Sequence, residues 1–261
     1  MTIFQSIILG LIEGLTEFLP ISSTAHLIIA STWLKIPESE FLKNFLISIQ
    51  LGAILSVAVL YFKTLIKSPR LILKIAAAFI PTSIIGLASY KLVKNLFMES
   101  LFIIAIALIV GGVILIILEK RFSLKNKEKN EAEGGLATIS YRQSALIGIF
   151  QALAVIPGVS RSAATIMGGL SLGISRKNIV EFSFLLALPT MAAATGYDLY
   201  KSPPAFSPEE ITVWIIGLIV SFVTAILGIK FFLKFIKKNN FISFGWYRII
   251  IGLIVLSYLF I

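Results

Sequence analysis

The sequence of 261 residues contains no cysteine and a single histidine, His26. The absence of cysteine excludes disulfides, thiolate nucleophiles and thiolate metal sites. Charge is also scarce, since only 14% of the residues are Asp, Glu, Lys or Arg. No Lys or Arg precedes Lys35, so the basic n-region of a cleaved signal peptide is missing, and we expect the N-terminus to belong to the mature fold.

Apolar residues dominate the composition, at 57% of the chain with a mean hydropathy of +0.97. One soluble core could not bury so much apolar surface, which predicts an integral membrane protein. Backbone groups in lipid must be hydrogen-bonded internally, and the apolar runs lack the alternation of a barrel strand, so we expect an all-α polytopic membrane protein. The net charge of +10 then indicates basic loops beside anionic lipid headgroups, and no nucleic acid partner is expected.

Six apolar stretches approach the length of a membrane-spanning helix. They cover about 45 to 62, 75 to 90, 101 to 118, 179 to 197, 211 to 229 and 246 to 261. Lys and Arg concentrate in the alternate loops 63–74, 120–142 and 230–238, which predicts that these loops are cytoplasmic. The other loops should face outward.

Two further apolar stretches, about 1 to 31 and 144 to 174, are interrupted in the middle by Pro, Gly and hydroxyl residues. A simple span at either place would break the sidedness of the basic loops. We therefore predict two re-entrant helical hairpins, the first entering from outside and the second from inside. Irregular backbone at membrane depth is tolerated where protein or a wet cavity surrounds it.

The two interrupted stretches resemble each other. "GLIEGLTEFLPISS" aligns with "GIFQALAVIPGVSR", with Glu13 over Gln151 and, after a one-residue gap, Ser23 over Ser160. This similarity predicts an inverted-topology repeat within a single membrane domain, 1–261. The first repeat covers 1–118, the polar cytoplasmic connector 119–137 and the second repeat 138–261.

The stretch "EGLTEFLPISSTAHL" places Glu13 and Glu17 at positions i and i+4, on one face of a helix. An unpaired carboxylate pair in hydrocarbon costs several kcal/mol, so a cation, a shared proton or an arginine must lie beside it. The alternative is a pair exposed at the membrane interface, which the apolar flanks argue against.

Pro20 ends that helix, and the following "SSTAH" offers three hydroxyl groups and His26 at a turn or a new helix N-terminus. Helix capping alone would need one hydroxyl. A serine activated by a neighbouring base is a common nucleophile, and histidine carries protons near neutral pH. Ser23 and His26 are therefore candidate catalytic residues.

The second interrupted stretch contains "PGVSRSAATIMGG", in which Arg161 is framed by Ser160, Ser162 and Thr165. A guanidinium, hydroxyl donors and free N–H groups at a helix N-terminus after Pro-Gly suit a phosphate group. The alternative is an arginine that extends to the membrane interface. By the repeat symmetry, we expect Arg161 to lie near Ser23 and the glutamates.

These paired motifs, with "IQLGA" and the spacing of the six spans, resemble the bacitracin-resistance type of undecaprenyl-diphosphate phosphatase over essentially the whole chain. The resemblance implies a bacterial inner-membrane enzyme that removes the terminal phosphate of a polyprenyl diphosphate, with a divalent cation such as Mg²⁺ or Ca²⁺ and a site open to the outer face. The family's catalytic residues correspond to Glu13, Glu17, Ser23 and His26, with both glutamates also candidate metal ligands, and its phosphate-binding residues to Ser160, Arg161, Ser162 and Thr165. Ala25 replaces the glycine often found before the histidine.

Other functions remain to be weighed against this one. A polyprenyl-phosphate transporter or flippase could use the same architecture and lipid-phosphate site, although transport does not require serine, histidine and two glutamates together. A membrane scaffold would leave the buried charges unexplained. A two-histidine phosphatase mechanism is excluded by the single histidine, and no GxxxxGK[ST] loop occurs. Whether Ser23 or His26 attacks phosphorus stays open, with Ser23 favoured because histidine attack leaves no second histidine to protonate the leaving group. Self-association as a homo-oligomer also stays open.

Overall fold

The computed structural model describes residues 1–97, 100–126, 135–201 and 206–259, and all regular structure in these residues is helical. The α-helices are α1 (Ile3–Thr16), α2 (Ser23–Trp33), α3 (Glu40–Lys67), α4 (Pro69–Phe97), α5 (Leu101–Asn126), α6 (Tyr141–Ala152), α7 (Arg161–Ser171), α8 (Arg176–Lys201), α9 (Pro208–Ile236) and α10 (Ile242–Tyr258). Two short 3₁₀ turns, η1 (Gly135–Thr138) and η2 (Leu153–Val155), lie beside α6. The all-α prediction is confirmed.

Five helices in the described part of the chain are long and apolar enough to cross a membrane, namely α3, α4, α5, α8 and α9. Multiple apolar helices of this length make the protein a multi-pass membrane protein. The sixth predicted span falls on α10, which is apolar but has 17 residues and is shorter than the other five.

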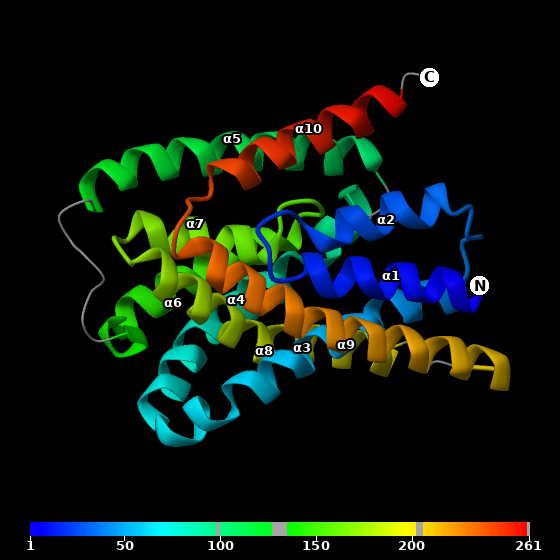
Figure 1. The fold of residues 1–261 in the computed structure, drawn as a ribbon, viewed down its shortest axis with the longest axis horizontal. Coiled ribbons are helices and arrows are strands. Elements are labelled where there is room, and N and C mark those ends of the chain that lie inside the picture. The colour runs from blue at the N-terminus through cyan, green and yellow to red at the C-terminus, as the bar shows by residue number, and fades with distance from the viewer. Residues whose placement is uncertain (98–99, 127–134, 202–205, 260–261) are drawn as a thin grey trace.

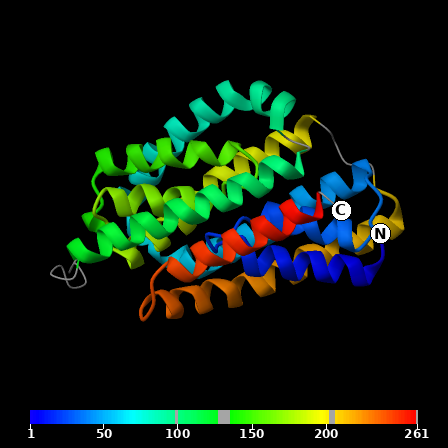
Figure 2. The ribbon, with the colours of Figure 1, turned by 90° about the horizontal axis from the view of Figure 1, so that it is seen from above.

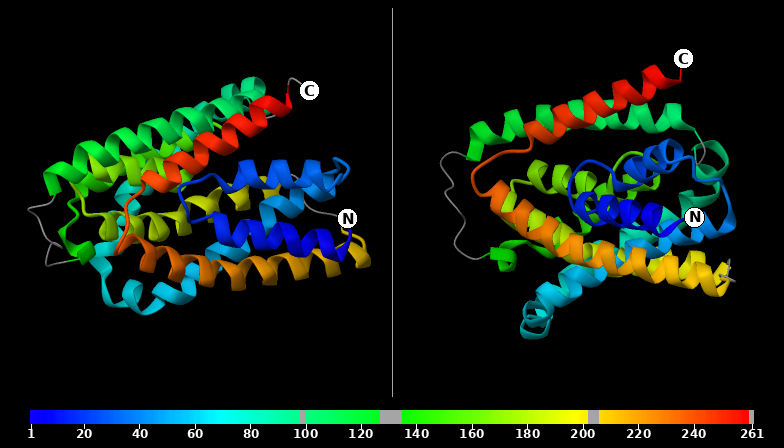
Figure 3. Two further views of the ribbon diagram at one scale, coloured as in Figure 1. Left: turned by 45° about the horizontal axis from the view of Figure 1, so that its top comes forward. Right: turned by 45° about the vertical axis from the view of Figure 1, so that its right-hand side comes forward.

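Each interrupted stretch forms a pair of neighbouring helices joined by a break. Residues 17–22 separate α1 from α2, and η2 with residues 156–160 separates α6 from α7. The two pairs enter the helix bundle from opposite ends, and their breaks lie in its middle (Figures 1 and 3). Proline occurs in both breaks, as the sequence predicts, and its ring disfavours a helix there. Pro81 and Pro189 are nevertheless accommodated inside α4 and α8.

The loops are sorted between the two ends of the bundle. The ends of α3, α5 and α9 from which the chain turns to the next helix all lie at the left in Figure 1. Lys and Arg concentrate at and beside these ends in the sequence, over 63–74, 120–142 and 230–238. The N-terminus and the end of α10 lie at the other end, as Figure 2 also shows. This arrangement agrees with the alternation of basic loops along the sequence.

The helices that carry the breaks pack on long helices from the other half of the chain. Helix α1 packs on α9, and α6 packs on α4, while α5 pairs with α10. Glycines allow the close approach: a Cβ at Gly10 would lie 2.7 Å from the carbonyl oxygen of Gly217, and Gly148 lies directly against the backbone of Ala78. Helices α1 and α6, the first helix of each pair, therefore pack closely on α9 and α4.

The structure corrects the alignment of the two interrupted stretches. Ser22 and Ser160 both precede a helix with a positive φ, of 71° and 68°, and Lys35 and Gly173 share a positive φ after it. Each pair is 138 positions apart in the sequence, so no gap is needed. The predicted one-residue gap is therefore wrong, because the backbone turn that begins each second helix fixes the alignment. Ser22 corresponds to Ser160, and Ser23 to Arg161.

Candidate active site

The two breaks bring together three of the predicted residues from distant parts of the chain. Glu17 caps the end of α1, Ser23 is the first residue of α2, and Arg161 is the first residue of α7. The side chains of Glu17 and Arg161 are only 7% and 12% exposed. The N-termini of α2 and α7 both meet at this point, and helix N-termini favour a bound anion.

Glu17 bridges the other two residues through its two carboxylate oxygens. The Ser23 hydroxyl donates a hydrogen bond to Oε2, and Nη2 of Arg161 donates to Oε1 at 2.8 Å. Nη1 of Arg161 also donates to the carbonyl oxygen of Ser183 at 3.0 Å. Ser23, Glu17 and Arg161 thus lie together as predicted, and an arginine is the group that neutralises Glu17.

Glu13 lies one helical turn before Glu17 and is fully buried. Neither of its carboxylate oxygens has a hydrogen-bond partner among the described residues. A buried carboxylate without a donor is costly, so its oxygens require a proton or a cation. In the described part of the chain, no group of three or more His, Cys, Asp or Glu side chains is placed to hold a metal ion. Two carboxylates are therefore what the protein itself can offer to a cation here.

The hydroxyl residues around Arg161 differ in their present contacts. Ser160 Oγ accepts from the backbone N–H of Ala163 at 3.2 Å and caps α7. The Thr165 hydroxyl pairs with that of Ser183 at 2.6 Å. Ser162 Oγ and Arg161 Nε are buried without a partner among the described residues. These two groups are the polar donors that a bound phosphate could use without breaking an existing contact.

His26 lies one turn after Ser23 on α2, but its ring makes other contacts. Nδ1 lies 2.7 Å from the carbonyl oxygen of Ser22, and Nε2 lies 2.8 Å from the hydroxyl of Tyr247 on α10. A carbonyl can only accept, so Nδ1 carries the proton, and Nε2 of the neutral ring accepts from Tyr247. The two rings stack, with 5.6 Å between centroids and 4° between planes. Glu17, rather than His26, is the group hydrogen-bonded to Ser23.

Sequence reasoning missed Arg248, which lies on α10 and is fully buried. Its guanidinium donates to the carbonyl oxygens of Pro20 and Gly158, each at 3.1 Å, and to two carbonyls of α5. Pro20 and Gly158 lie in the two breaks, so one side chain ties both breaks together. A single arginine within the apolar "YRIIIGLIVL" was the signal that could have revealed it.

Comparisons with known proteins cover nearly the whole chain. The family model described as "Bacitracin resistance protein BacA" matches residues 6–254. A protein named undecaprenyl-diphosphatase from Wolinella succinogenes is 51% identical over 259 residues, 99% of each chain. Proteins of the same name from Aquifex aeolicus and Bdellovibrio bacteriovorus are 48% and 46% identical, and the alignments cover 97% or more of every chain.

Proposed function

Because this chain belongs to the family of bacitracin resistance protein BacA, we propose that the meeting point of its two helix breaks is the active site of an undecaprenyl-diphosphatase. The protein is an integral membrane enzyme that hydrolyses undecaprenyl diphosphate to undecaprenyl phosphate and inorganic phosphate. This reaction regenerates the lipid carrier of cell-wall synthesis and is consistent with bacitracin resistance. The names of the relatives favour hydrolysis over the transport alternative.

One observation carries the mechanism: Glu17 accepts from both the Ser23 hydroxyl and the Arg161 guanidinium. In the first step, Ser23 Oγ attacks the terminal phosphorus while its proton passes to Glu17. The new Ser23 O–P bond forms as the bond from phosphorus to the bridging oxygen breaks, and undecaprenyl phosphate leaves. Water then attacks the phosphoserine, and its oxygen bonds to phosphorus as the Ser23 Oγ–P bond breaks. Ser23 Oγ takes back the proton from Glu17, and inorganic phosphate leaves.

Arg161 is the main phosphate ligand in this proposal. Substrate phosphate oxygens replace the carboxylate of Glu17 on Nη2 and use the unpartnered Nε, which gives the bidentate contact that arginine makes with phosphate. The unpartnered hydroxyl of Ser162 adds a donor. Ser160 and Thr165 support the start of α7 through their present contacts, and the same hydroxyls can turn toward phosphate oxygens.

His26 serves as a proton carrier rather than the nucleophile. Both its ring nitrogens are already engaged, by Ser22 and Tyr247. Direct attack by Nε2 would require the contact with Tyr247 to break first. The position of His26, one turn from Ser23, lets it exchange protons with the site through water.

A divalent cation, Mg²⁺ or Ca²⁺, fits the two glutamates. Glu13 offers two buried carboxylate oxygens that have no partner in the part of the chain that the structure describes, and Glu17 lies one turn away. Hard divalent cations prefer such oxygen ligands and usually share them with substrate phosphates and water. When bound, the ion would neutralise phosphate charge.

The membrane arrangement that we propose is an inverted repeat with six spans, α10 included, and two re-entrant hairpins in the bacterial inner membrane, with the site open to the outer face. The opposed entry of the two helix pairs and the basic loops at one end support it. Single cysteines at positions 38 and 67 should react with an impermeant reagent from opposite sides. Labelling of both positions from one side would contradict the topology.

The mechanism is tested by phosphate release from undecaprenyl diphosphate. Ser23→Ala should be nearly inactive, whereas Thr24→Ala, which removes the neighbouring exposed hydroxyl, should retain activity. His26→Ala should retain a slow rate, because acid–base assistance is worth about 10²- to 10⁴-fold. A chelator should abolish turnover, and Glu13→Gln should weaken the response to added cation. An acid-labile, alkali-stable phosphoenzyme that disappears in His26→Ala would instead identify His26 as the nucleophile.

A further inference from the structure

Ser183 of α8 is a buried serine whose hydroxyl and carbonyl groups contact two different residues of the candidate site. Its hydroxyl pairs with that of Thr165 at 2.6 Å, and its carbonyl oxygen accepts from Nη1 of Arg161 at 3.0 Å. Arg161 and Thr165 are four residues apart on α7, so both lie on the face of α7 that packs on α8. Ser183 and Thr165 are both fully buried. One residue of α8 thus contacts two groups that the proposed function assigns to phosphate.

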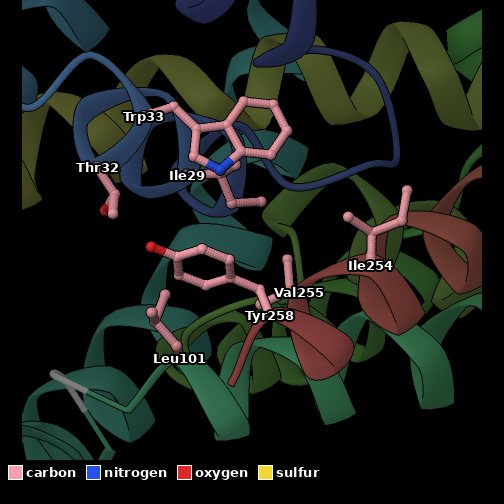
Figure 4. Close-up of a pocket in the computed structure, with 7 residues that line it drawn as sticks. All are labelled: Ile29, Thr32, Trp33, Leu101, Ile254, Val255 and Tyr258. Atoms are coloured by element: carbon pink, nitrogen blue, oxygen red, sulfur yellow. The ribbon is translucent and has the colours of Figure 1, made fainter. Parts of the chain in front are cut away.

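This interior cluster differs from the pocket between α2 and α10, which Figure 4 shows. Apolar side chains such as Ile29, Trp33 and Ile254 line that pocket, and none of the described residues in its lining carries a charge. A phosphate group favours charged and hydroxyl donors, and the cluster around Arg161 offers both. The contacts of this cluster are therefore the place where a further residue can affect phosphate binding.

The hydroxyl protons of Ser183 and Thr165 can be assigned from their acceptors. Thr165 Oγ1 lies 2.9 Å from the carbonyl oxygen of Ser162 and 3.1 Å from that of Arg161, and a carbonyl oxygen only accepts. Thr165 therefore directs its single hydroxyl proton at its own helix. Among the described residues, Thr165 is the hydrogen-bond partner of the Ser183 hydroxyl. Because a buried hydroxyl proton needs an acceptor, Ser183 donates to Thr165.

The direction of this hydrogen bond matters for a bound phosphate. Since Ser183 supplies the proton between the two hydroxyls, Thr165 can rotate its own proton from the α7 carbonyls to a phosphate oxygen. Its oxygen keeps the contact with Ser183 during this rotation. A hydroxyl that accepts one hydrogen bond is also a stronger donor in the next, because successive hydrogen bonds polarise each other. Ser183 thereby makes Thr165 a better donor to an anion.

The carbonyl group of Ser183 restrains Arg161 at the same time. Nη1 on this carbonyl and Nη2 on the Glu17 carboxylate hold the guanidinium at two points. The central carbon of the guanidinium also lies 5.8 Å from the centroid of the Phe18 ring. Nε has no partner among the described residues and remains for a phosphate oxygen. The orientation of Arg161 therefore depends on α8 as well as on α7.

We propose that Ser183 is a positioning residue of the phosphate site: its hydroxyl orients Thr165 as a donor to the terminal phosphate, and its carbonyl orients Arg161. The proposal rests on the proposed function, because it takes the phosphate to lie beside Arg161. Ser183 acts through these two residues and does not touch the phosphate itself. The role of its hydroxyl can be tested separately, because substitution by alanine leaves the carbonyl in place.

The test is a double-mutant cycle on phosphate release from undecaprenyl diphosphate. Ser183→Ala removes the orienting hydroxyl, and Thr165→Val removes the donor that it orients. We expect Ser183→Ala to lower kcat about three- to tenfold with little change in KM, the effect of one neutral hydrogen bond that acts in the transition state. Thr165→Val should be less active than Ser183→Ala. Adding Ser183→Ala to Thr165→Val should cause no further loss, because the donor is already absent.

Ser221→Ala is the matched control. Ser221 is also fully buried, and its hydroxyl on α9 donates to the carbonyl oxygen of Ile49 on α3 at 2.8 Å, so it too joins two helices. Both alanine variants should unfold at a slightly lower temperature than the wild type, whereas only Ser183→Ala should have a lower kcat. Ser183→Thr keeps the hydroxyl and should retain more of the wild-type kcat than Ser183→Ala.

Several outcomes would overturn the proposal. Additive losses in Ser183→Ala and Thr165→Val, or equal kcat in Ser183→Ala and Ser221→Ala, would show that Ser183 only packs α8 against α7. Wild-type kcat in Thr165→Val would remove Thr165 from the phosphate site, and with it the role of Ser183, while an inactive Ser23→Ala would still support the proposed active site. Absence of phosphate release by the wild type would contradict the proposed function itself.

Discussion

The two helix pairs, α1 with α2 and α6 with α7, have nearly the same backbone. Each begins with a capping box, made by Thr2 with Gln5 in the first pair and by Ser140 with Gln143 in the second. The amide of each glutamine also donates to the end of its second helix, at 3.2 Å to the carbonyl of Leu34 and at 3.3 Å to that of Leu172. The same local interactions therefore fold both pairs.

The chemistry of the two pairs differs at equivalent positions. Where the first pair has Glu13 and Ser23, the second has Gln151 and Arg161. Gln151 donates to the hydroxyl of Thr82 at 3.3 Å, whereas Glu13 has no partner among the described residues. The first pair thus supplies the carboxylates and a hydroxyl, and the second supplies the positively charged guanidinium of Arg161. These groups lie together because the two breaks do.

The largest expected effect is on activity, from Arg161→Lys. The variant keeps the positive charge of the second pair but loses the forked geometry that the proposed contact with two phosphate oxygens requires. We expect kcat/KM to fall about 10²- to 10³-fold, the usual cost of losing one transition-state donor. Arg142→Lys, at an exposed position on α6, is the control and should be unaffected. Near-normal turnover of Arg161→Lys would place Arg161 outside the phosphate site.

The second prediction concerns the link between the pairs. Arg248→Met leaves the carbonyls of Pro20 and Gly158 without their donor, so both breaks lose a charge-assisted hydrogen bond. We expect the free energy of unfolding to fall by about 3 kcal/mol, from hydrogen bonds to a charged group worth roughly 1.5–3 kcal/mol each. Thermal unfolding in detergent measures the change, and Arg121→Met, at an exposed position on α5, is the control. A stable and fully active Arg248→Met would show that the breaks hold together without it.

Much of this architecture is predictable from the sequence, because it depends on local signals. Long apolar runs predict the spanning helices, and proline with glycine and hydroxyl residues in an apolar stretch predicts each break. Proline alone does not, since Pro81 and Pro189 lie inside α4 and α8. The meeting of Ser23 and Arg161 could also be predicted, since the repeat and the sidedness of the loops place both breaks at one depth. Each of these steps needs only the order of residue types along the chain.

The remaining features depend on contacts between helices that are distant in sequence. Tyr247 bonds His26 because α10 passes α2, and Arg248 reaches both breaks because α10 lies beside α5. No local pattern encodes either contact. The prolines predict a gap in the alignment of the two stretches, and this prediction is wrong because the positive φ of Ser22 and Ser160, visible only in the backbone, fixes the alignment without one.

The third prediction makes the first pair more like the second. Glu13→Gln replaces a buried carboxylate, which no described residue contacts with a donor, by an amide that can donate to the nearby Glu17. We expect the free energy of unfolding to rise by about 1 kcal/mol, the scale of one buried hydrogen bond, while activity falls because a proposed cation ligand is lost. Thermal unfolding and phosphate release are measured on the same preparation. The reverse change, Gln151→Glu, should destabilise the protein; a loss of stability in Glu13→Gln would mean that the carboxylate has a favourable partner.

The smallest expected effect is a difference in stability between glycine substitutions in the two turns that begin α2 and α7. Ser22 and Ser160 both have a positive φ, which L-residues other than glycine adopt at a cost of roughly 1–3 kcal/mol. Glycine removes that cost but has more freedom in the unfolded chain, which offsets about 0.5–1 kcal/mol. The Ser22 side chain makes no cap hydrogen bond, whereas Ser160 accepts from Ala163, so Ser160→Gly also loses a cap. Ser22→Gly should therefore raise the free energy of unfolding by up to about 1 kcal/mol, and Ser160→Gly by less. Thermal unfolding of both variants beside the wild type measures the difference, and a clear loss of stability in Ser22→Gly would mean that its hydroxyl, rather than its backbone, is what the first turn requires.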